Sequence, residues 1–260
     1  MNDTKPAQLI RYLARGWALV PLHDVTAGHC SCQDGPLCRS AGKHPRASQW
    51  QRPENLVITE TKLWDTLTGW PSSNWGLATG LISQCWALDF DPKSVTEASA
   101  AEVAAILALL AQVPTWQQRT GSGGAHWVFA LPDDFMPNNS AKRLPDGFDV
   151  RGARAGQWGG GQIVLAPSVS GVGAYAVLHD GDVLPAPAAL LDLLRPTPPR
   201  ERVRHGVTMP LNADAVQRYV TAATAGELAD LEGTLSRRND RAWRAAARVH
   251  RQVDPQPRGK

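Results

Sequence analysis

The sequence predicts a mixed fold of the α/β (α+β) class, in which helices alternate with strands. Short apolar runs of strand length occur at residues 73–79 and 85–88. Residues 96–110 are rich in alanine and leucine and precede Pro114, which predicts a long helix. Another strand is predicted at residues 115–119. The succession of strand, helix and strand indicates this fold class.

The same patterns predict further elements on both sides of this core. Helices are predicted at residues 7–15 and 60–67, and strands at residues 17–22, 127–131, 147–152, 162–166 and 174–178. A proline-rich stretch then indicates a short helix and a stiff linker. We expect a main domain of residues 1–198, a linker of residues 199–211 and a helical subdomain of residues 212–260.

Composition limits the classes of function that the chain can have. The chain is 43% hydrophobic and 20% charged, which is typical of a globular protein. No apolar run approaches the ~18 residues that a membrane helix needs. The N-terminal residues also lack the continuous apolar core of a signal peptide. We therefore expect a cytoplasmic location and no membrane partner.

Positive charge is concentrated at the C-terminal end. Residues 1–199 hold 15 Lys and Arg against 17 Asp and Glu, whereas residues 200–260 hold 12 against 7. Five arginines there recur at spacings of four and three, which on a helix places them in a stripe about 80° wide. These arginines are Arg237, Arg241, Arg244, Arg248 and Arg251. The stripe fits a solvated helix face or a surface that binds DNA phosphates.

Three cysteines lie within nine residues in a long irregular segment, residues 23–46. In a cytosolic chain such a cluster is more often a metal site than a disulfide framework. Cys30, Cys32, Cys38 and His44 would make a tetrahedral structural Zn²⁺ site. Such a site contributes on the order of 10 kcal/mol of folding free energy. His29 is a competing ligand, and the alternative is free surface thiols beside an incidental histidine.

Two carboxylates follow the predicted strand at residues 85–88. Side chains alternate across a strand, so Asp89 and Asp91 are expected on the same face, and Pro92 ends the strand. Carboxylates placed this way repel each other unless a cation lies between them. The pair therefore suits Mg²⁺ or Mn²⁺. The alternative is a solvated strand end that runs into a turn.

A glycine-rich turn precedes the next strand. Gly121, Gly123 and Gly124 surround Ser122 and allow the backbone to approach a ligand closely. Backbone amides in such a turn, with His126 beside them, fit a phosphate-binding site. The pattern G-x-x-x-x-G-K-[ST] is absent, so the turn is not a P-loop. The alternatives are a tight hairpin and a half-buried histidine in the core.

Together these segments resemble one family. They are DFD at 89–91, SGGAH at 122–126, FDVRG at 148–152, QIVLAPSVSGVGAY at 162–175, GLATG at 76–80, RGW…PL at 15–22 and the Cys/His loop that ends in GKHP. Their order and spacing resemble the bifunctional primase-polymerase (Prim-Pol) family of the archaeo-eukaryotic primase superfamily, found in plasmids, phages and mobile elements. The resemblance covers roughly residues 7–180 and departs from the family in the long loop GARAGQWGGG.

The resemblance implies a fold and a metal site. The fold would be an α/β unit packed on a modified RRM-like antiparallel sheet, with the active site between them, a zinc-binding loop and a C-terminal helical appendage. Asp89, Asp91 and Asp149 match the family's catalytic carboxylates and would hold two Mg²⁺ or Mn²⁺ ions. The zinc loop would either grip the template and position the first nucleotide or only stabilise its own segment.

It also implies how a nucleotide is bound. Ser122, the backbone amides of Gly123 and Gly124, and His126 match the family's phosphate-binding turn, and His126 is also counted among the catalytic residues. Arg151 would add positive charge near the triphosphate or the template, because a guanidinium matches phosphate bidentately.

The implied function is a DNA primase and polymerase. It would start and extend primers on single-stranded DNA by two-metal nucleotidyl transfer from nucleoside triphosphates, in phage, plasmid or mobile-element replication. A replicative helicase, in cis or in trans, is a possible partner. The alternatives are a non-catalytic DNA-binding module of a replication initiator and a metal-dependent nuclease. Clustered carboxylates argue against the first, and the phosphate-binding turn argues against the second.

Overall fold

The computed structural model describes residues 4–140, 143–153, 160–195 and Thr221. The chain divides into two compact units, residues 1–197 and 198–260, and all named helices and strands belong to the first. Apart from Thr221, the predicted linker, the predicted helical subdomain and its five arginines lie outside the described residues.

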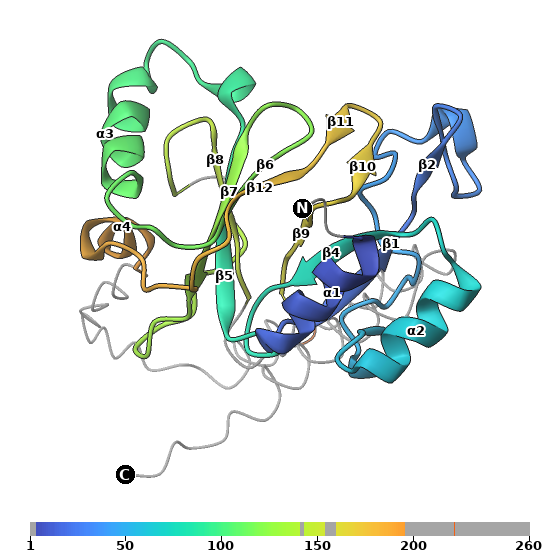
Figure 1. Cartoon of the computed structure of the whole chain (residues 1–260). Coiled ribbons are helices and arrows are strands. Elements are labelled where there is room, and N and C mark those ends of the chain that lie inside the picture. The colour runs from blue at the N-terminus through green and yellow to red at the C-terminus, as the bar shows by residue number, and fades with distance from the viewer. Residues whose placement is uncertain (1–3, 141–142, 154–159, 196–220, 222–260) are drawn as a thin grey trace. The chain divides into compact units, whose positions relative to one another are not determined.

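A five-stranded antiparallel sheet forms the centre of the first unit (Figure 1). Its strands, in spatial order, are β12 (Ala176–His179), β6 (Gln117–Arg119), β7 (Ala125–Ala130), β5 (Cys85–Phe90) and β8 (Phe148–Arg151). The predicted apolar strand at residues 85–88 is the first part of β5. The strand β5 lies between β7, which pairs with its whole length, and β8, which pairs with residues 87–90.

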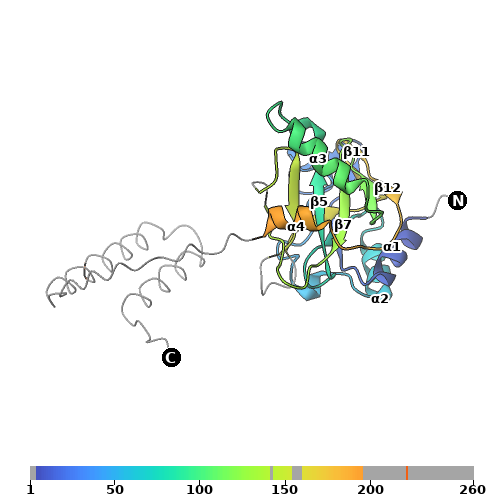
Figure 2. The ribbon, with the colours of Figure 1, turned by 90° about the vertical axis from the view of Figure 1, so that its left-hand side faces the viewer.

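Two helices cover one face of this sheet. They are α3 (Ala100–Leu110) and α4 (Ala188–Leu194), and Figure 2 shows both in front of the strands. Their apolar side chains pack with those of alternate strand residues in one cluster, which includes Trp86, Leu88 and Phe129. Each fully buried side chain of this size contributes roughly 1.5–3 kcal/mol. The alternate residues of the same strands therefore point to the opposite face.

The opposite face packs against a second layer. This layer contains a three-stranded antiparallel sheet with the order β1 (Leu19–Leu22), β4 (Asn74–Ala78) and β9 (Gln162–Val164), together with α1 (Lys5–Ala14) and α2 (Glu60–Gly69) (Figure 1). Side chains from both sheets and both helices form one apolar cluster. This packing brings β9 alongside the five-stranded sheet.

Aromatic rings stabilise the contact between the layers. Tyr12 of α1 stacks on Trp17 with ring centroids 5.3 Å apart, and Trp17 meets Trp116 edge to face at 5.1 Å. Such pairs add about 0.5–1.5 kcal/mol each beyond the burial of their surface. All three rings are almost completely buried.

Short elements complete the described chain. They are the hairpin of β2 (Val25–Thr26) and β3 (His29–Cys30), the hairpin of β10 (Val169–Ser170) and β11 (Gly173–Ala174), and the 3₁₀ turns η1 (Gly35–Leu37), η2 (Pro53–Asn55) and η3 (Pro92–Ser94). The elements β2, β3 and η1 lie in residues 23–46, for which the sequence predicts no regular element. Each of the three is only two or three residues long.

The sequence-based fold class is confirmed, since helices pack on antiparallel sheets in an α+β arrangement. An RRM-like sheet stays a prediction. One helix boundary differs: α3 begins at Ala100 instead of residue 96, because Thr96 and Ser99 form a turn held by hydrogen bonds between their own side chains and backbone.

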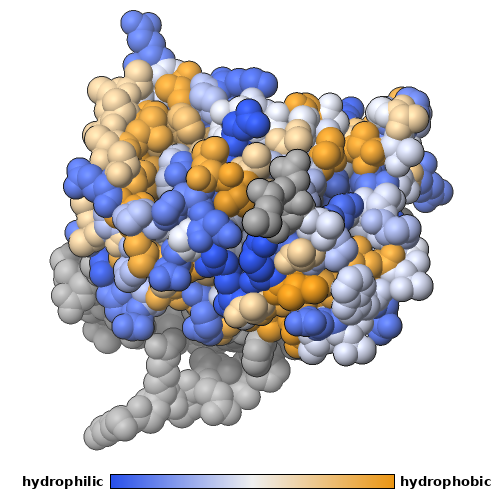
Figure 3. Space-filling view, viewed as in Figure 1, coloured by the Kyte–Doolittle hydropathy of each residue, from blue (hydrophilic) through white to orange (hydrophobic). Residues whose placement is uncertain are grey.

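The face of the molecule seen in Figure 3 carries both hydrophilic and hydrophobic residues. A cluster of hydrophilic residues lies near the middle of this face. Arg15, directly after α1, forms an ion pair of 2.9 Å with Asp180, just after β12. Exposed pairs of this kind contribute at most about 1 kcal/mol. Within the described part of the chain, no helix has both the length and the apolar character needed to cross a membrane.

Candidate active site and metal centre

Four polar residues form a row across the five-stranded sheet. Asp89 on β5 lies directly opposite His126 on β7 and directly opposite Asp149 on β8, and Gln118 on β6 lies opposite His126. Residues directly opposite in antiparallel strands present their side chains on the same face. This polar row, Gln118–His126–Asp89–Asp149, therefore lies on the face that α3 and α4 leave free.

The side chains of the row contact one another. His126 Nε2 lies 3.2 Å from Asp89 Oδ1. One guanidinium nitrogen of Arg151, Nη2, lies 2.9 Å from Asp149 Oδ2 and 3.6 Å from Asp89 Oδ2. His126 is 5% exposed, whereas the two carboxylates are 28% and 36% exposed. The carboxylates are thus partly open to solvent beside a buried imidazole, and Arg151 neutralises part of their charge.

The two carboxyl groups have different acidities. Burial alone would raise the pKa of Asp89, but the hydrogen bond from His126 and the charge and hydrogen bond of Arg151 outweigh burial and lower it. Burial raises the pKa of Asp149, and the charge of Asp89 acts in the same direction while Arg151 opposes it. A nearby cation would therefore stabilise the ionised form of Asp149 more than that of Asp89.

Asp91 reaches the same cleft from outside the strand. The strand β5 ends at Phe90, and Asp91 caps η3, where its Oδ1 accepts a hydrogen bond of 3.1 Å from the backbone of Lys93. Asp89, Asp91 and Asp149 all line one cleft. Among the described residues, however, the three carboxylates do not form a group whose ligand atoms all lie within 4.8 Å of one another.

The glycine turn is held together by Thr120. The backbone N–H of Gly123 donates to Thr120 O, and that of Gly124 donates to Thr120 Oγ1, at 3.1 and 3.0 Å. Both amides expected to bind phosphate are thus already hydrogen-bonded inside the turn. Ser122 and His126 line the cleft. A Cβ on Gly124 would lie 1.9 Å from Phe90 O, so this glycine is needed for close packing on β5.

The cleft has a volume of about 760 Å³ and is lined from both layers. Sequence reasoning missed several of its residues. Lys43 and Trp50 come from the loop that follows the cysteines, Gln162 comes from β9, and Tyr175 comes from the segment after β11. Burial, with the nearby charge of Asp89, raises the pKa of Tyr175 to about 12, so its phenol stays protonated.

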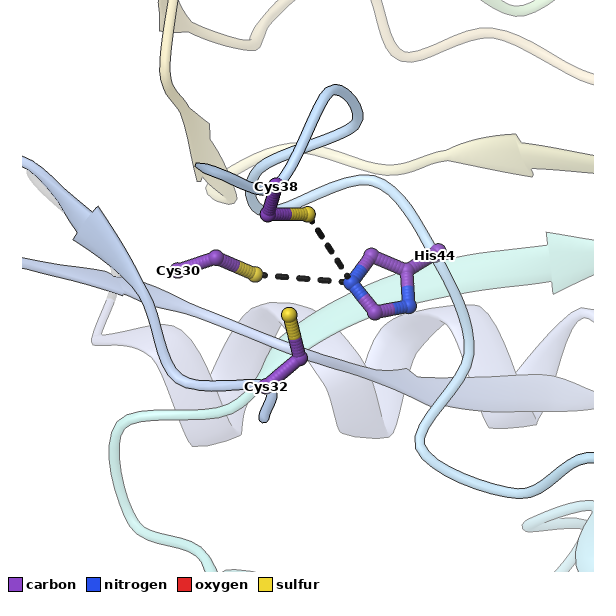
Figure 4. Close-up of side chains that lie close together, drawn as sticks. All are labelled: Cys30, Cys32, Cys38 and His44. Atoms are coloured by element: carbon purple, nitrogen blue, oxygen red, sulfur yellow. Dashed lines mark hydrogen bonds between the residues drawn. The ribbon is translucent and has the colours of Figure 1, made fainter. Parts of the chain in front are cut away.

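The cysteine cluster assembles as the sequence predicts. Ligand atoms of Cys30, Cys32, Cys38 and His44 all lie within 4.8 Å of one another, and Figure 4 shows them converging. His44 Nε2 lies 3.4 Å from both Cys30 Sγ and Cys38 Sγ. The alternative ligand His29 is not part of this group. Three thiols and one imidazole are a donor set that fits tetrahedral Zn²⁺.

The loop between Cys38 and His44 is held by three hydrogen bonds, one of them from the cleft residue Gln162. Gln162 Nε2 donates to Lys43 O at 2.9 Å, and Asn74 Nδ2 donates to Gly42 O at 2.9 Å. The backbone N–H of Gly171 donates to Ala41 O at 3.1 Å. The cysteine cluster and the cleft therefore share one short piece of backbone, which carries the Lys43 side chain.

A cleft between two sheets, with carboxylates and basic groups on its wall, is the kind of site that handles phosphorylated substrates with divalent cations. The family model described as bifunctional DNA primase/polymerase, N-terminal, matches residues 9–189. The chain belongs to this family, which confirms the resemblance seen in the sequence and indicates a primase/polymerase-type role in DNA replication. No curated protein matches the chain.

Proposed function

We propose that the chain starts and extends primers on single-stranded DNA by nucleotidyl transfer from nucleoside triphosphates. The observation that carries this proposal is the polar row in the cleft, where Asp89 lies between His126 and Asp149. A carboxylate pair beside a buried imidazole matches what phosphoryl transfer requires, namely ligands for cations and a donor for phosphate.

Asp89, Asp91 and Asp149 would hold two Mg²⁺ or Mn²⁺ ions. The donor set fits, since all ligands are hard oxygens and the pKa of one carboxyl, Asp149, is raised by burial and by the charge of Asp89. When bound, the ions would make the primer 3′-hydroxyl more acidic and stabilise the leaving pyrophosphate. Asp91 would have to release the Lys93 amide to bring all three carboxylates together.

Ser122, His126 and Lys43 would bind the triphosphate, since all three line the cleft. Arg151 contacts both carboxylates in this structure, so its proposed contact with phosphate requires a side-chain rotation away from them. The amides of Gly123 and Gly124 could contribute only after their hydrogen bonds to Thr120 break. We therefore assign phosphate binding mainly to side chains.

The cysteine cluster would hold a structural Zn²⁺ ion. Because Lys43 lies one residue before the cluster residue His44 and its carbonyl is hydrogen-bonded to Gln162 on the wall of the cleft, ordering the cluster also orders Lys43. This favours a role in positioning the nucleotide or template over a role restricted to the loop. The arginine stripe of the tail is proposed to bind template phosphates, and a replicative helicase in phage, plasmid or mobile-element replication is a proposed partner.

A single assay distinguishes this function from the alternatives. The full-length chain is incubated with a single-stranded template, labelled nucleotides and Mg²⁺ or Mn²⁺. Products longer than any supplied primer support the proposal, a shortened template indicates a nuclease, and a mobility shift without chemistry indicates a binding module. Asp89→Asn should abolish synthesis, whereas Asp65→Asn, at an exposed carboxylate on α2, should not.

A further inference from the structure

Gln118 is a polar side chain with no exposed surface in the core behind the cleft. Burying an amide is costly unless its hydrogen-bonding groups are satisfied. Its Nε2 lies 2.5 Å from Val164 O and 2.8 Å from His126 Nδ1, and its Oε1 lies 2.9 Å from Ala166 N. Gln118 therefore connects the polar row to the chain of β9 and the residues directly after it.

The orientation of the Gln118 amide is fixed by the backbone. The N–H of Ala166 can only donate, so it must face the amide oxygen. The carbonyl of Val164 can only accept, so it must face the amide nitrogen. A flipped amide would set donor against donor and acceptor against acceptor. The second hydrogen of the NH₂ group thus points at His126 Nδ1.

This orientation determines which ring nitrogen of His126 carries hydrogen. Nδ1 receives a hydrogen bond from Gln118 and must act as the acceptor. The hydrogen then resides on Nε2, which donates to Asp89 Oδ1 at 3.2 Å. Of the two neutral tautomers, the structure therefore favours the one with hydrogen on Nε2.

We propose that Gln118 is a positioning residue that holds His126 in the Nε2–H tautomer, so that the ring presents a hydrogen-bond donor to Asp89 and to the cleft. The tautomer follows from the geometry alone, whereas its consequence for catalysis rests on the proposed function. A ring held this way cannot accept the proton of the primer hydroxyl at Nε2. Its single Nε2–H can orient Asp89, and it can donate to a phosphate oxygen only after it leaves Asp89.

The first test is spectroscopic and uses the unaltered full-length chain. Long-range ¹H–¹⁵N NMR spectra distinguish the two neutral tautomers of a histidine ring, and the His126 signals are identified by their loss in His126→Asn. We expect a protonated Nε2 and an unprotonated Nδ1. A ring protonated at Nδ1 would overturn the proposal, even if the chain synthesises primers normally.

The second test uses two neighbouring glutamines. Gln118→Leu keeps most of the side-chain volume but removes every hydrogen bond, so we expect nitrogen shifts that reflect both tautomers and a ~10- to 100-fold loss of primer extension. Gln117→Leu, one residue earlier on β6, should leave the ring and the activity unchanged. Circular dichroism establishes that both variants fold.

The outcomes separate this inference from the proposed function. A folded Gln118→Leu variant in which His126 keeps a single Nε2–H tautomer would show that Gln118 does not control the ring. Loss of the tautomer without loss of extension would limit Gln118 to a structural role. If the wild-type chain makes no primer while its His126 ring is an Nε2–H tautomer, the proposed function fails but the tautomer assignment stands.

Discussion

Asp89 and Asp149 lie directly opposite each other on adjacent strands, and Arg151 Nη2 contacts both carboxylates, at 3.6 and 2.9 Å. Like charges opposite each other destabilise a sheet. Arg151 opposes this repulsion, and it is mainly burial that raises the pKa of Asp149. The sheet therefore carries a partly buried carboxylate, Asp149, whose ionised form a divalent cation would stabilise.

The first prediction concerns Asp149→Asn. We expect primer extension to fall by at least ~100-fold, because losing a metal ligand removes part of a contribution of several kcal/mol to transition-state stabilisation. Without divalent cations the variant should melt at the same temperature as the wild type or higher, because the raised pKa of Asp149 means that its ionised form is less favourable in the folded chain than in the unfolded chain. Thermal melts and extension assays, each with and without Mg²⁺, measure both effects. Near-normal extension by the variant would disprove the assignment of this carboxylate.

The second prediction concerns the base of the cysteine loop, where Asp24 Oδ1 and Arg46 Nη2 form a largely buried ion pair of 2.5 Å. Burial alone would raise the pKa of Asp24, but hydrogen bonds from Ser31, Ser72 and Thr26 outweigh burial and lower it. A lowered pKa means that the stabilisation is complete above the unfolded-state pKa, near the model-compound value of 3.8, and is lost as the pH falls through the folded-state pKa.

Asp24→Asn should therefore reduce the free energy of unfolding by about 3 kcal/mol at neutral pH, as expected for breaking a buried pair. The difference from wild type should shrink in strongly acidic buffer. Denaturant titrations at several pH values measure it. The matched control is Glu54→Gln, which removes an exposed pair with Arg52 at 3.7 Å and should cost at most about 1 kcal/mol. A pH-independent cost for Asp24→Asn would contradict the electrostatic explanation.

The third prediction is one zinc ion per chain. Elemental analysis of protein purified without added metal should give one equivalent, and chelation should lower the melting temperature, because the loop has little apolar core of its own. Cys30→Ser should abolish zinc binding. Cys85→Ser should leave the zinc content unchanged, since Cys85 is a completely buried residue of β5 outside the cluster. A substoichiometric zinc content with no response to chelation would count against the site.

The fourth prediction tests the link between the cysteine loop and the cleft. Lys43→Gln should raise the KM for the nucleotide roughly tenfold with little change in kcat, because the lysine is placed to attract phosphate and not to take part in the reaction. Lys62→Gln is the control, since Lys62 lies outside this cleft and donates to Glu54 O. Equal effects of both substitutions would mean that the cleft lysine acts only through net charge.

Much of this arrangement follows from local sequence, but the site itself does not. Apolar runs and glycines predict β5, β7 and β8, and cysteine spacing predicts the metal cluster, because these signals act within a few residues. The pairing of Asp89 with both His126 and Asp149 depends on the register of three strands that are far apart in the chain. Nothing in the local sequence predicts a role for Gln118 in the site. A glutamine in a strand is ordinarily solvent-exposed, and only tertiary packing buries this one.

The last prediction concerns the C-terminal tail, whose arginines lie outside the described residues. If the five-arginine stripe binds template, each phosphate that it neutralises should steepen the dependence of log K on log salt by roughly 0.7 for single-stranded DNA. Replacing the stripe with glutamines, or removing residues 200–260, should weaken template binding and flatten that slope. Initiation should suffer more than extension of a supplied primer, because initiation has no duplex to anchor the chain.

A control with the same loss of charge decides whether the stripe or the net charge is responsible. Five other arginines of the tail can be replaced by glutamine, namely Arg202, Arg204, Arg218, Arg238 and Arg258. Filter-binding isotherms over a range of salt concentrations give the slope for each variant. If the stripe contacts DNA, the slope of log K against log salt should be flatter for the stripe variant than for this control. Identical slopes in the two variants would reduce the stripe to a solvated helix face and place template binding elsewhere in the protein.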